Sequence, residues 1–102
     1  MTCTVALIPA YNPSESLITL VHELLEKEIR CVVVDDGSGQ SYEGIFASLD
    51  PGTTVLHQVP NQGKGAALKR GMRYLQDVYP DAVVVTADAD GQHLSEDIVR
   101  VS

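Results

Sequence analysis

Three short runs of apolar residues constrain the fold of this chain more than any other feature. They cover residues 4–8, 30–34 and 82–87, and apolar residues follow one another in them without alternating with polar ones. Such runs are typical of strands that are covered on both faces, as in parallel sheets. A fourth run, residues 53–58, has a mixed pattern and is expected to form a strand nearer the edge of the sheet.

Segments with helical spacing of apolar residues lie between these runs. Residues 15–27 and 65–78 each carry one apolar stripe, and residues 42–49 form a weaker pattern of the same kind. A further helix is expected to begin at residues 94–97, with Ser95 as its N-cap. The alternation of strands and helices predicts an α/β fold. We expect a Rossmann-like, mostly parallel sheet with helices on both faces.

Length and charge limit the classes of function. The chain has 102 residues, enough for one domain or part of one, and we expect residues 1–102 to be the N-terminal part of a larger domain. Its formal net charge is −7, which argues against binding to nucleic acid. No apolar run is long enough to span a membrane. Cys3 and Cys31 are expected to be reduced and buried, which favours a cytoplasmic location.

Acidic side chains follow two of the apolar runs directly. Asp35 and Asp36 come after the second run, and Asp88 and Asp90 come after the last. In open α/β sheets the ligand crevice lies at the carboxyl ends of the strands, so these loops are expected to meet at one edge. Two carboxylates two residues apart suit Mg²⁺, which binds a few carboxylates together with substrate phosphates. The alternative for Asp88 and Asp90 is a solvated turn.

Other segments at the same edge each allow two interpretations. Asp35 and Asp36 are placed to accept hydrogen bonds from a ribose or base, or they cap a turn in which a glycine has positive φ. Residues 61–67, NQGKGAA, are similar to a phosphate loop, or they begin a helix after glycine turns. Tyr11 either stacks on a base or packs within its loop. Lys69, Arg70 and Arg73 are expected to form a solvated helix face.

Four motifs together resemble one enzyme family. They are PAYN at residues 9–12, VDDGS at 34–38, NQGKGAA at 61–67 and DADGQH at 88–93. Their order and spacing resemble those of the family 2 glycosyltransferases, and within them the polyprenyl-phosphate and dolichyl-phosphate sugar synthases. The resemblance implies a GT-A fold, a UDP- or GDP-sugar donor, inversion at the anomeric carbon, and a lipid-phosphate or saccharide acceptor. A full-length enzyme of this kind can associate with the cytoplasmic face of the membrane.

The same resemblance implies roles for individual residues. Pro9, Tyr11 and Asp36 would surround the base and ribose, and Lys64 would lie near the nucleotide. Asp88, Asp90 and Gln92 would hold Mg²⁺ or Mn²⁺ on the diphosphate. The full nucleotide-binding set expected here is Pro9, Tyr11, Asn12, Asp35, Asp36, Gly63, Lys64 and Asp88. An acceptor-side catalytic base would lie beyond these 102 residues.

Two departures from the family pattern weaken the assignment to the synthases more than the assignment to the family. Pro13 stands where an acidic residue is common after the Tyr-Asn pair, and Ser95 stands where the synthases often have Pro. Two alternatives to an enzyme of this type stay open. One is a sugar-phosphate nucleotidyltransferase, and the other is a non-catalytic module that binds a nucleotide-sugar. The 102 residues alone are expected to bind the donor without completing transfer, and to self-associate through exposed apolar surfaces.

Overall fold

The computed structural model describes residues 3–58, 60–87 and 94–100. Strands and helices alternate through most of this length, as the sequence predicts. In chain order the elements are β1 (Thr4–Ala10), α1 (Ser16–Glu26), β2 (Arg30–Asp36), the 3₁₀ turn η1 (Gln40–Tyr42), α2 (Glu43–Ala47), β3 (Thr54–Gln58), α3 (Lys64–Val78), β4 (Val83–Ala87) and β5 (Leu94–Arg100). Within the described residues, no helix is both long enough and apolar enough to cross a membrane.

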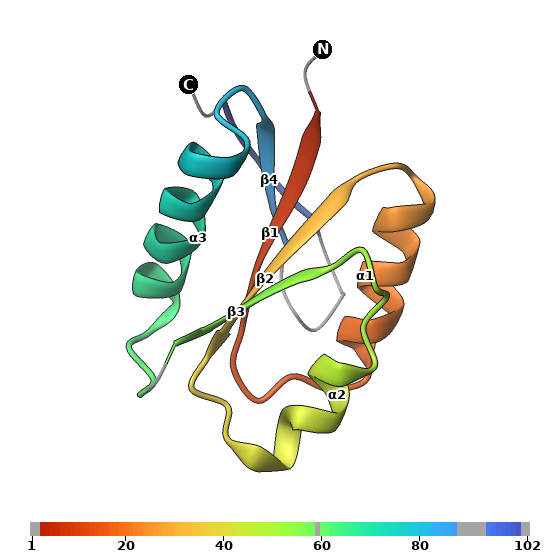
Figure 1. Ribbon diagram of the computed structural model, residues 1–102, viewed down its shortest axis with the longest axis vertical. Helices are drawn as coiled ribbons and strands as arrows, with labels where there is room; N and C mark the ends of the chain where they lie inside the picture. The colour runs from red at the N-terminus through yellow and green to blue at the C-terminus, as the bar shows by residue number, and fades with distance from the viewer. Residues whose placement is uncertain (1–2, 59, 88–93, 101–102) are drawn as a thin grey trace.

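The five strands form one sheet in the order β3-β2-β1-β4-β5. The first four strands are parallel, and β5 runs antiparallel to β4. Helix α3 covers one face of the sheet, while α1 and α2 lie on the other (Figure 1). This arrangement confirms the predicted Rossmann-like fold with helices on both faces. It also places β3 at an edge, as its mixed pattern predicts.

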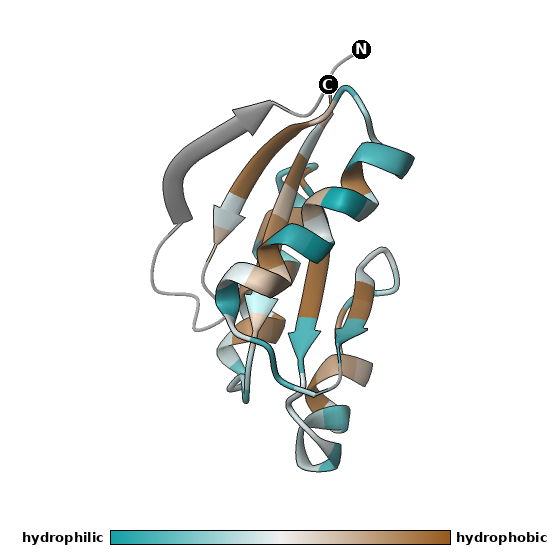
Figure 2. Cartoon of the chain, turned by 90° about the vertical axis from the view of Figure 1, so that its left-hand side faces the viewer, coloured by the Kyte–Doolittle hydropathy of each residue, from teal (hydrophilic) through white to brown (hydrophobic). Residues whose placement is uncertain are grey.

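Side chains of the central strands alternate between two apolar cores. Along β1, Ala6 and Ile8 pack on the side of α1, while Val5 and Leu7 pack on the side of α3. Strand β2 is divided in the same way, and the central residues of both strands are almost fully buried. The apolar colouring of the strands and the hydrophilic outer side of α3 are visible in Figure 2. Burial on both faces explains the continuous apolar runs, because each residue has a helix to pack against.

The prediction of a helix beginning at residues 94–97 is wrong. The structure has strand β5 there, with Val99 opposite Val84, Ile98 opposite Val85, and a register shift before Leu94 opposite Ala87. The Ser-Glu-Asp sequence of this segment resembles a helix start, but the β-branched residues that follow suit a strand. Without β5, strand β4 would have an unpaired edge. Tertiary pairing therefore overrides the local capping signal.

Helix α3 packs tightly against the sheet at Gly71. A Cβ at this position would meet the terminal methyl carbons of Leu7, which is fully buried in β1. We expect Gly71→Ala to lower the free energy of unfolding, because overpacking a tight core costs about 1–3 kcal/mol. This cost outweighs the gain of about 1 kcal/mol in helix propensity. Urea unfolding followed by circular dichroism measures the difference.

The matched control is Gly65→Ala in the first turn of the same helix. No atom lies within 4 Å of a Cβ built there, so this variant is expected to be as stable as the parent or slightly more stable. Equal stability of the two variants would show that the contact between Gly71 and Leu7 does not limit the approach of α3.

Candidate functional site

The carboxyl ends of the parallel strands and the start of α3 meet at one edge of the sheet. Strands β1, β2 and β3 end at this edge, and α3 begins nearby, in the lower half of Figure 1. Helix α3 starts after Gly63, whose φ of 97° is easy only for glycine. The first turn of the helix therefore lies at the edge where the strands end. Such a position favours anions, because the positive end of the helix dipole lies there.

The carboxylate of Asp36 holds this edge together. Its Oδ1 accepts hydrogen bonds from Gln58 Nε2 (2.8 Å) and from the Gln62 backbone N–H (2.8 Å). Its Oδ2 accepts hydrogen bonds from Asn61 Nδ2 (3.0 Å) and from the Gly63 backbone N–H (2.9 Å). Asn61 also donates to the Asp36 backbone carbonyl at 2.9 Å. A carboxylate has about four acceptor sites, so these donors occupy all of the acceptor capacity of Asp36.

Asp36 is buried, with 3% of its surface exposed, and it is nevertheless held in its charged form. Burial by itself would raise the pKa of this carboxyl. The hydrogen bonds from the backbone of Gln62, the side chain of Gln58 and the backbone of Gly63 more than offset that effect and lower the pKa below its usual value. The charge is therefore stabilised by donors from β3 and from the loop that precedes α3.

Gly37 allows the two loops to come together. It has φ of 73°, and a Cβ at this position would collide with the backbone nitrogen of Asn61. Any other residue would therefore push the loop of residues 60–63 away from the end of β2. The turn that follows β2 matches the predicted alternative in which glycine takes positive φ.

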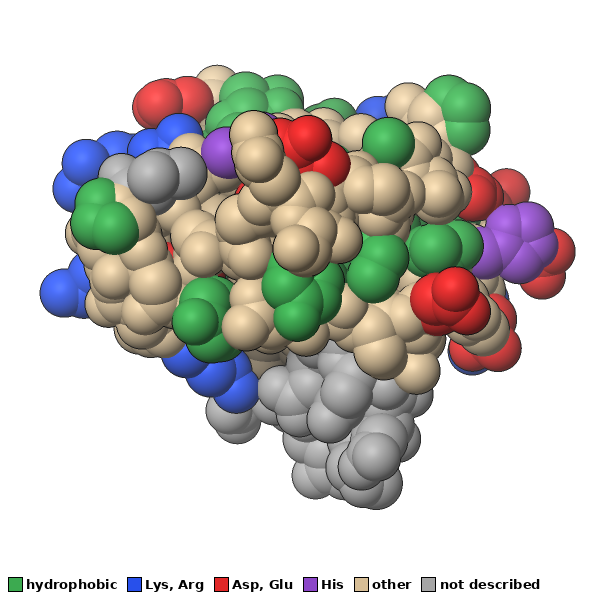
Figure 3. All heavy atoms as spheres, turned by 90° about the horizontal axis from the view of Figure 1, so that it is seen from below, with side chains coloured by type: hydrophobic (Ala, Val, Ile, Leu, Met, Phe, Trp, Pro, Cys, Tyr) green, Lys and Arg blue, Asp and Glu red, His purple; other side chains and the backbone are tan. Residues whose placement is uncertain are grey.

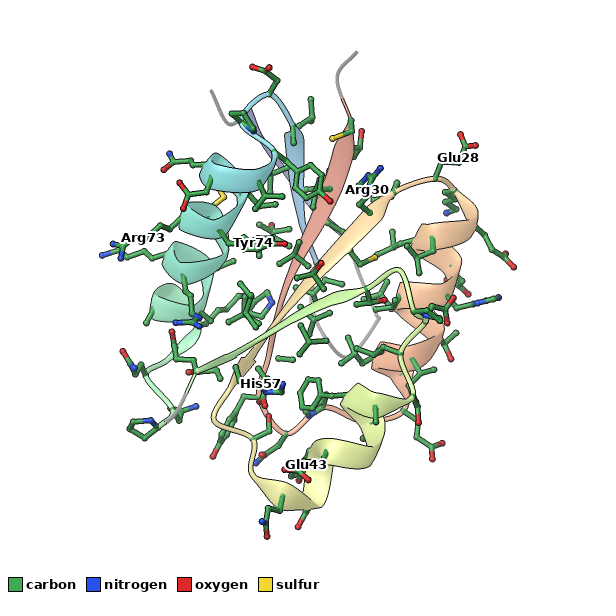
Figure 4. The ribbon with its side chains drawn as sticks, in the orientation of Figure 1. Glu28, Arg30, Glu43, His57, Arg73 and Tyr74 are labelled. Carbon is green, nitrogen blue, oxygen red and sulfur yellow. The ribbon has the colours of Figure 1, made fainter. Side chains whose placement is uncertain are left out.

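Asp35, the neighbour of Asp36, links three further segments. Its Oδ1 accepts a hydrogen bond from the Ser38 backbone N–H at 3.0 Å, which caps the turn. Ser38 Oγ in turn accepts one from the Asn12 backbone N–H at 2.9 Å, so the loop after β1 is tied to the loop after β2. The Oδ2 of Asp35 lies 2.9 Å from Nδ1 of His57 on β3 (Figure 4). Because each oxygen has one protein partner, Asp35 keeps acceptor capacity that Asp36 lacks.

A pocket of about 160 Å³ opens at this edge. It is lined by Pro9, Ala10, Tyr11, Asp36 and Lys64. Tyr11 is 57% exposed, so its side chain is accessible to a ligand. The pocket is smaller than the roughly 300 Å³ at which sites for whole small molecules begin, so it fits one part of a larger ligand.

The structure brings most of the predicted nucleotide-binding residues together. Pro9, Tyr11, Asp36 and Lys64 line one pocket, Asn12 and Asp35 are joined through Ser38, and Gly63 donates to Asp36. The predicted metal ligands Asp88, Asp90 and Gln92 lie outside the described residues. In the part of the chain that the structure describes, no cluster of three or more His, Cys, Asp or Glu side chains could hold a metal ion.

Several residues of this network were missing from the sequence predictions. His57, Gln58 and Ser38 belong to this network and were not among the predicted site residues. The parallel register of β2 and β3 sets Asp35 beside His57 and Asp36 beside Gln58. A known register would therefore have identified both partners, since residues opposite each other on neighbouring strands point to the same face.

Comparison with known protein families matches residues 5–101 to "Glycosyl transferase family 2". This match covers almost the whole chain, including all four strand-end segments that the sequence analysis singled out. The described part of the fold agrees with it, because the loops after β1, β2 and β3 converge on one edge.

Curated relatives agree with the family match. The chain is 36% identical to an undecaprenyl-phosphate mannosyltransferase of Micrococcus luteus, over 93% of this chain and 41% of that protein. It is 33% identical to a polyprenol monophosphomannose synthase of Mycolicibacterium smegmatis, over 96% of this chain and 39% of the relative.

A third relative is a UDP-N-acetylglucosamine–dolichyl-phosphate N-acetylglucosaminyltransferase of Methanococcus voltae, at 29% identity over 93% of this chain and 44% of the relative. The chain thus spans about two fifths of the length of the curated relatives it matches. With a family match over residues 5–101 and an edge of strand-end loops that agrees with it, the chain belongs to glycosyl transferase family 2.

Proposed function

We propose that this chain is the donor-binding part of an inverting glycosyltransferase that uses a nucleotide-sugar. In this proposal, residues 1–102 hold the nucleoside diphosphate, and residues beyond them complete the acceptor side. The observation that carries the proposal is the pocket between Tyr11, Asp36 and Lys64, at the edge where the strands end and α3 begins. Family membership favours glycosyl transfer over nucleotidyl transfer.

The chemistry of this pocket suits a nucleotide. The exposed ring of Tyr11 offers a face on which a base can stack, and base–aromatic stacking contributes about 1–3 kcal/mol. The Lys64 side chain and the first turn of α3 bring positive charge to the same edge, where a diphosphate is favoured. The small volume is consistent with a site for the base or ribose, with the diphosphate extending beyond it toward the end of β4.

The two neighbouring aspartates take different roles in this proposal. Asp36 has no acceptor capacity left, so it positions the loop that leads to Lys64 and does not bind the ligand directly. Asp35 has one protein donor on each oxygen and keeps sites for a hydrogen bond from the base or ribose. Sequence analysis gave this polar contact to both aspartates, and of the two only Asp35 keeps acceptor capacity for it, while Asp36 lines the pocket as a positioning residue.

We assign the metal to Asp88, Asp90 and Gln92. Carboxylate and amide oxygens are the ligands that Mg²⁺ and Mn²⁺ prefer. Ala87 and Leu94, which flank these residues in the chain, are register partners in the sheet, and Ala87 ends β4 beside β1. A divalent cation bound there would stabilise the negative charge that develops on the departing diphosphate.

The acceptor class follows from the relatives and not from the pocket. The names of the three relatives share a polyprenyl or dolichyl phosphate, while the sugars differ between mannose and N-acetylglucosamine. We therefore propose a polyprenyl-phosphate acceptor in preference to a saccharide, and leave the sugar unassigned. A phosphate acceptor is already anionic, so attack on the anomeric carbon needs less help from a general base than attack by a hydroxyl.

The first test is binding of the leaving group. We expect UDP or GDP to bind in the presence of Mn²⁺, and EDTA or Asp90→Ala to weaken that binding about tenfold or more, a change of about 1.4 kcal/mol or more. The reason is that the cation would bridge the carboxylate and the diphosphate. Isothermal titration calorimetry with each nucleotide measures the effect.

Asp81→Ala serves as the control, because Asp81 is an exposed aspartate between α3 and β4. It is expected to bind as the parent does. Absence of binding by both nucleotides, or binding that neither EDTA nor Asp90→Ala changes, would contradict the proposed donor site.

The second test concerns Asp36 and the hydrogen bonds by which it holds the loop before α3. Asp36→Asn replaces one carboxylate oxygen with an NH₂ group, which leaves two converging donors without an acceptor. Each buried donor left unpaired costs about 1–3 kcal/mol, so we expect lower stability and weaker nucleotide binding. Hydrogen exchange is expected to speed up at the Gln62 and Gly63 amides, and two-dimensional NMR measures it residue by residue.

Asp81→Asn makes the same substitution at an exposed site and is expected to leave exchange at those amides unchanged. Acid should act in the same direction as Asp36→Asn. Because the pKa of Asp36 is lower in the folded than in the unfolded chain, its contribution is complete above about pH 4 and is lost as pH falls further. Unchanged protection of Gln62 and Gly63 in Asp36→Asn would show that the carboxylate does not hold the loop.

A further inference from the structure

A second and larger pocket lies on the other side of the loop that Asp36 anchors. It has a volume of about 410 Å³ and opens between the edge strand β3 and the first half of α3. Its lining residues are His57, Gln58, Gln62, Ala66, Lys69, Arg70 and Arg73. None of the donor-pocket residues is among them, so the two pockets are distinct.

The charge of this pocket is opposite to that of the whole chain. The chain has 14 acidic and 7 basic residues, yet three of the basic ones line this pocket and no described Asp or Glu does. Figure 3 shows Lys and Arg side chains gathered on the left, over α3, while most acidic side chains lie toward the opposite side. Positive charge concentrated at one concave surface of an acidic protein indicates attraction of an anion.

The spacing of these residues makes one face of α3. Ala66, Lys69, Arg70 and Arg73 follow the i, i+3, i+4, i+7 pattern, so they share a side of the helix. Ala66 lies at the N-terminal end of this face, and its short side chain leaves room beside Lys69 and Arg70. The helix face encloses the pocket together with His57 and Gln58 of β3, which distinguishes it from an evenly solvated helix surface.

Each of Lys69, Arg70 and Arg73 is exposed, and none of them forms an ion pair with a described acidic side chain. His57, with 58% of its side chain exposed, uses Nδ1 toward Asp35 and so has its other ring nitrogen available for a further contact. The Gln62 side chain is exposed at the same rim and supplies an amide donor.

The two pockets share a wall. Gln58 lines the basic pocket, Asp36 lines the donor pocket, and Gln58 Nε2 donates to Asp36 Oδ1 at 2.8 Å. Gln62 also lines the basic pocket, and its backbone N–H donates to the same oxygen. A ligand in the basic pocket would thus contact residues that anchor the loop, without entering the donor pocket.

We propose that this basic pocket binds a phosphate-bearing anion without a divalent cation. Two guanidinium groups and one ammonium group can neutralise a phosphate, and arginine does so with paired hydrogen bonds. The volume falls within the range of sites for small molecules, so the anion can carry a further group beside its phosphate. The phosphate can belong to a soluble molecule or to a lipid headgroup, and the experiment separates these sources.

The test is an NMR titration of the chain with pyrophosphate in EDTA. EDTA removes the metal on which the proposed donor site depends, so failure of the donor proposal would not affect this result. We expect amide shifts at Gln62, Ala66, Arg70 and Arg73 that saturate, and that sodium chloride of equal ionic strength does not reproduce. The second arm measures sedimentation with vesicles of phosphatidylcholine, with and without phosphatidylglycerol.

The variant is Arg70→Gln with Arg73→Gln, and its charge-matched control is Lys27→Gln with Arg30→Gln, at exposed positions away from the pocket. Circular dichroism confirms that both variants fold. We expect the pocket variant to bind pyrophosphate about tenfold or more weakly than the control, because each lost charge-assisted hydrogen bond weakens the site.

The outcomes decide between the sources. Saturable pyrophosphate binding that only the pocket variant loses supports the site with a soluble anion. Binding only to vesicles with phosphatidylglycerol, lost in the same variant, supports it with a lipid headgroup. The proposal is overturned if neither probe binds, if sodium chloride reproduces the shifts, or if the two double variants bind equally.

Discussion

The Asp36 carboxylate is the interaction on which the arrangement of this site depends. It is a buried charge, and such a charge is tolerated only when hydrogen bonds replace its lost hydration. Here the replacement comes from β3 and from the loop before α3, so satisfying one charge sets the positions of two segments. The loop leads directly into Lys64 and the start of α3. The buried negative charge of Asp36 therefore positions the positive groups of this edge, Lys64 and the N-terminus of α3.

Much of the fold could be predicted because its central strands are buried on both faces. The runs at β1, β2 and β4 need a helix on each side, and that requirement alone indicates a parallel α/β sheet. The position of β3 at an edge followed from its mixed pattern. The error at β5 has an equally physical cause. Ser95, Glu96 and Asp97 are favourable at a helix start, but the pairing of β5 with β4 is a long-range interaction that local sequence does not encode.

The site could be predicted as a set of residues but not as a set of contacts. Strand-end placement was enough to bring Pro9, Tyr11, Asp35, Asp36 and Lys64 to one edge. It was not enough to show that Asp36 is fully occupied by protein donors, because that depends on the register of β2 against β3 and on the close approach allowed by Gly37. The same register brought His57 beside Asp35. The sequence alone does not predict which carboxylate a histidine in an edge strand will contact.

The sequence distances within the Asp36 network have a consequence for folding. Every donor to Asp36 lies 22 to 27 residues further along the chain, beyond η1 and α2, either at the end of β3 or in the loop that follows it. No short segment can therefore contain the network. It forms only after β3 has paired in parallel with β2, and such long-range parallel pairing forms slowly during folding. A ligand that needs this edge binds the folded chain alone, so its binding energy adds to the stability of the whole sheet. Ligand binding is thus coupled to the folding equilibrium of the chain. A substitution far from the ligand that destabilises the fold will therefore also weaken ligand binding.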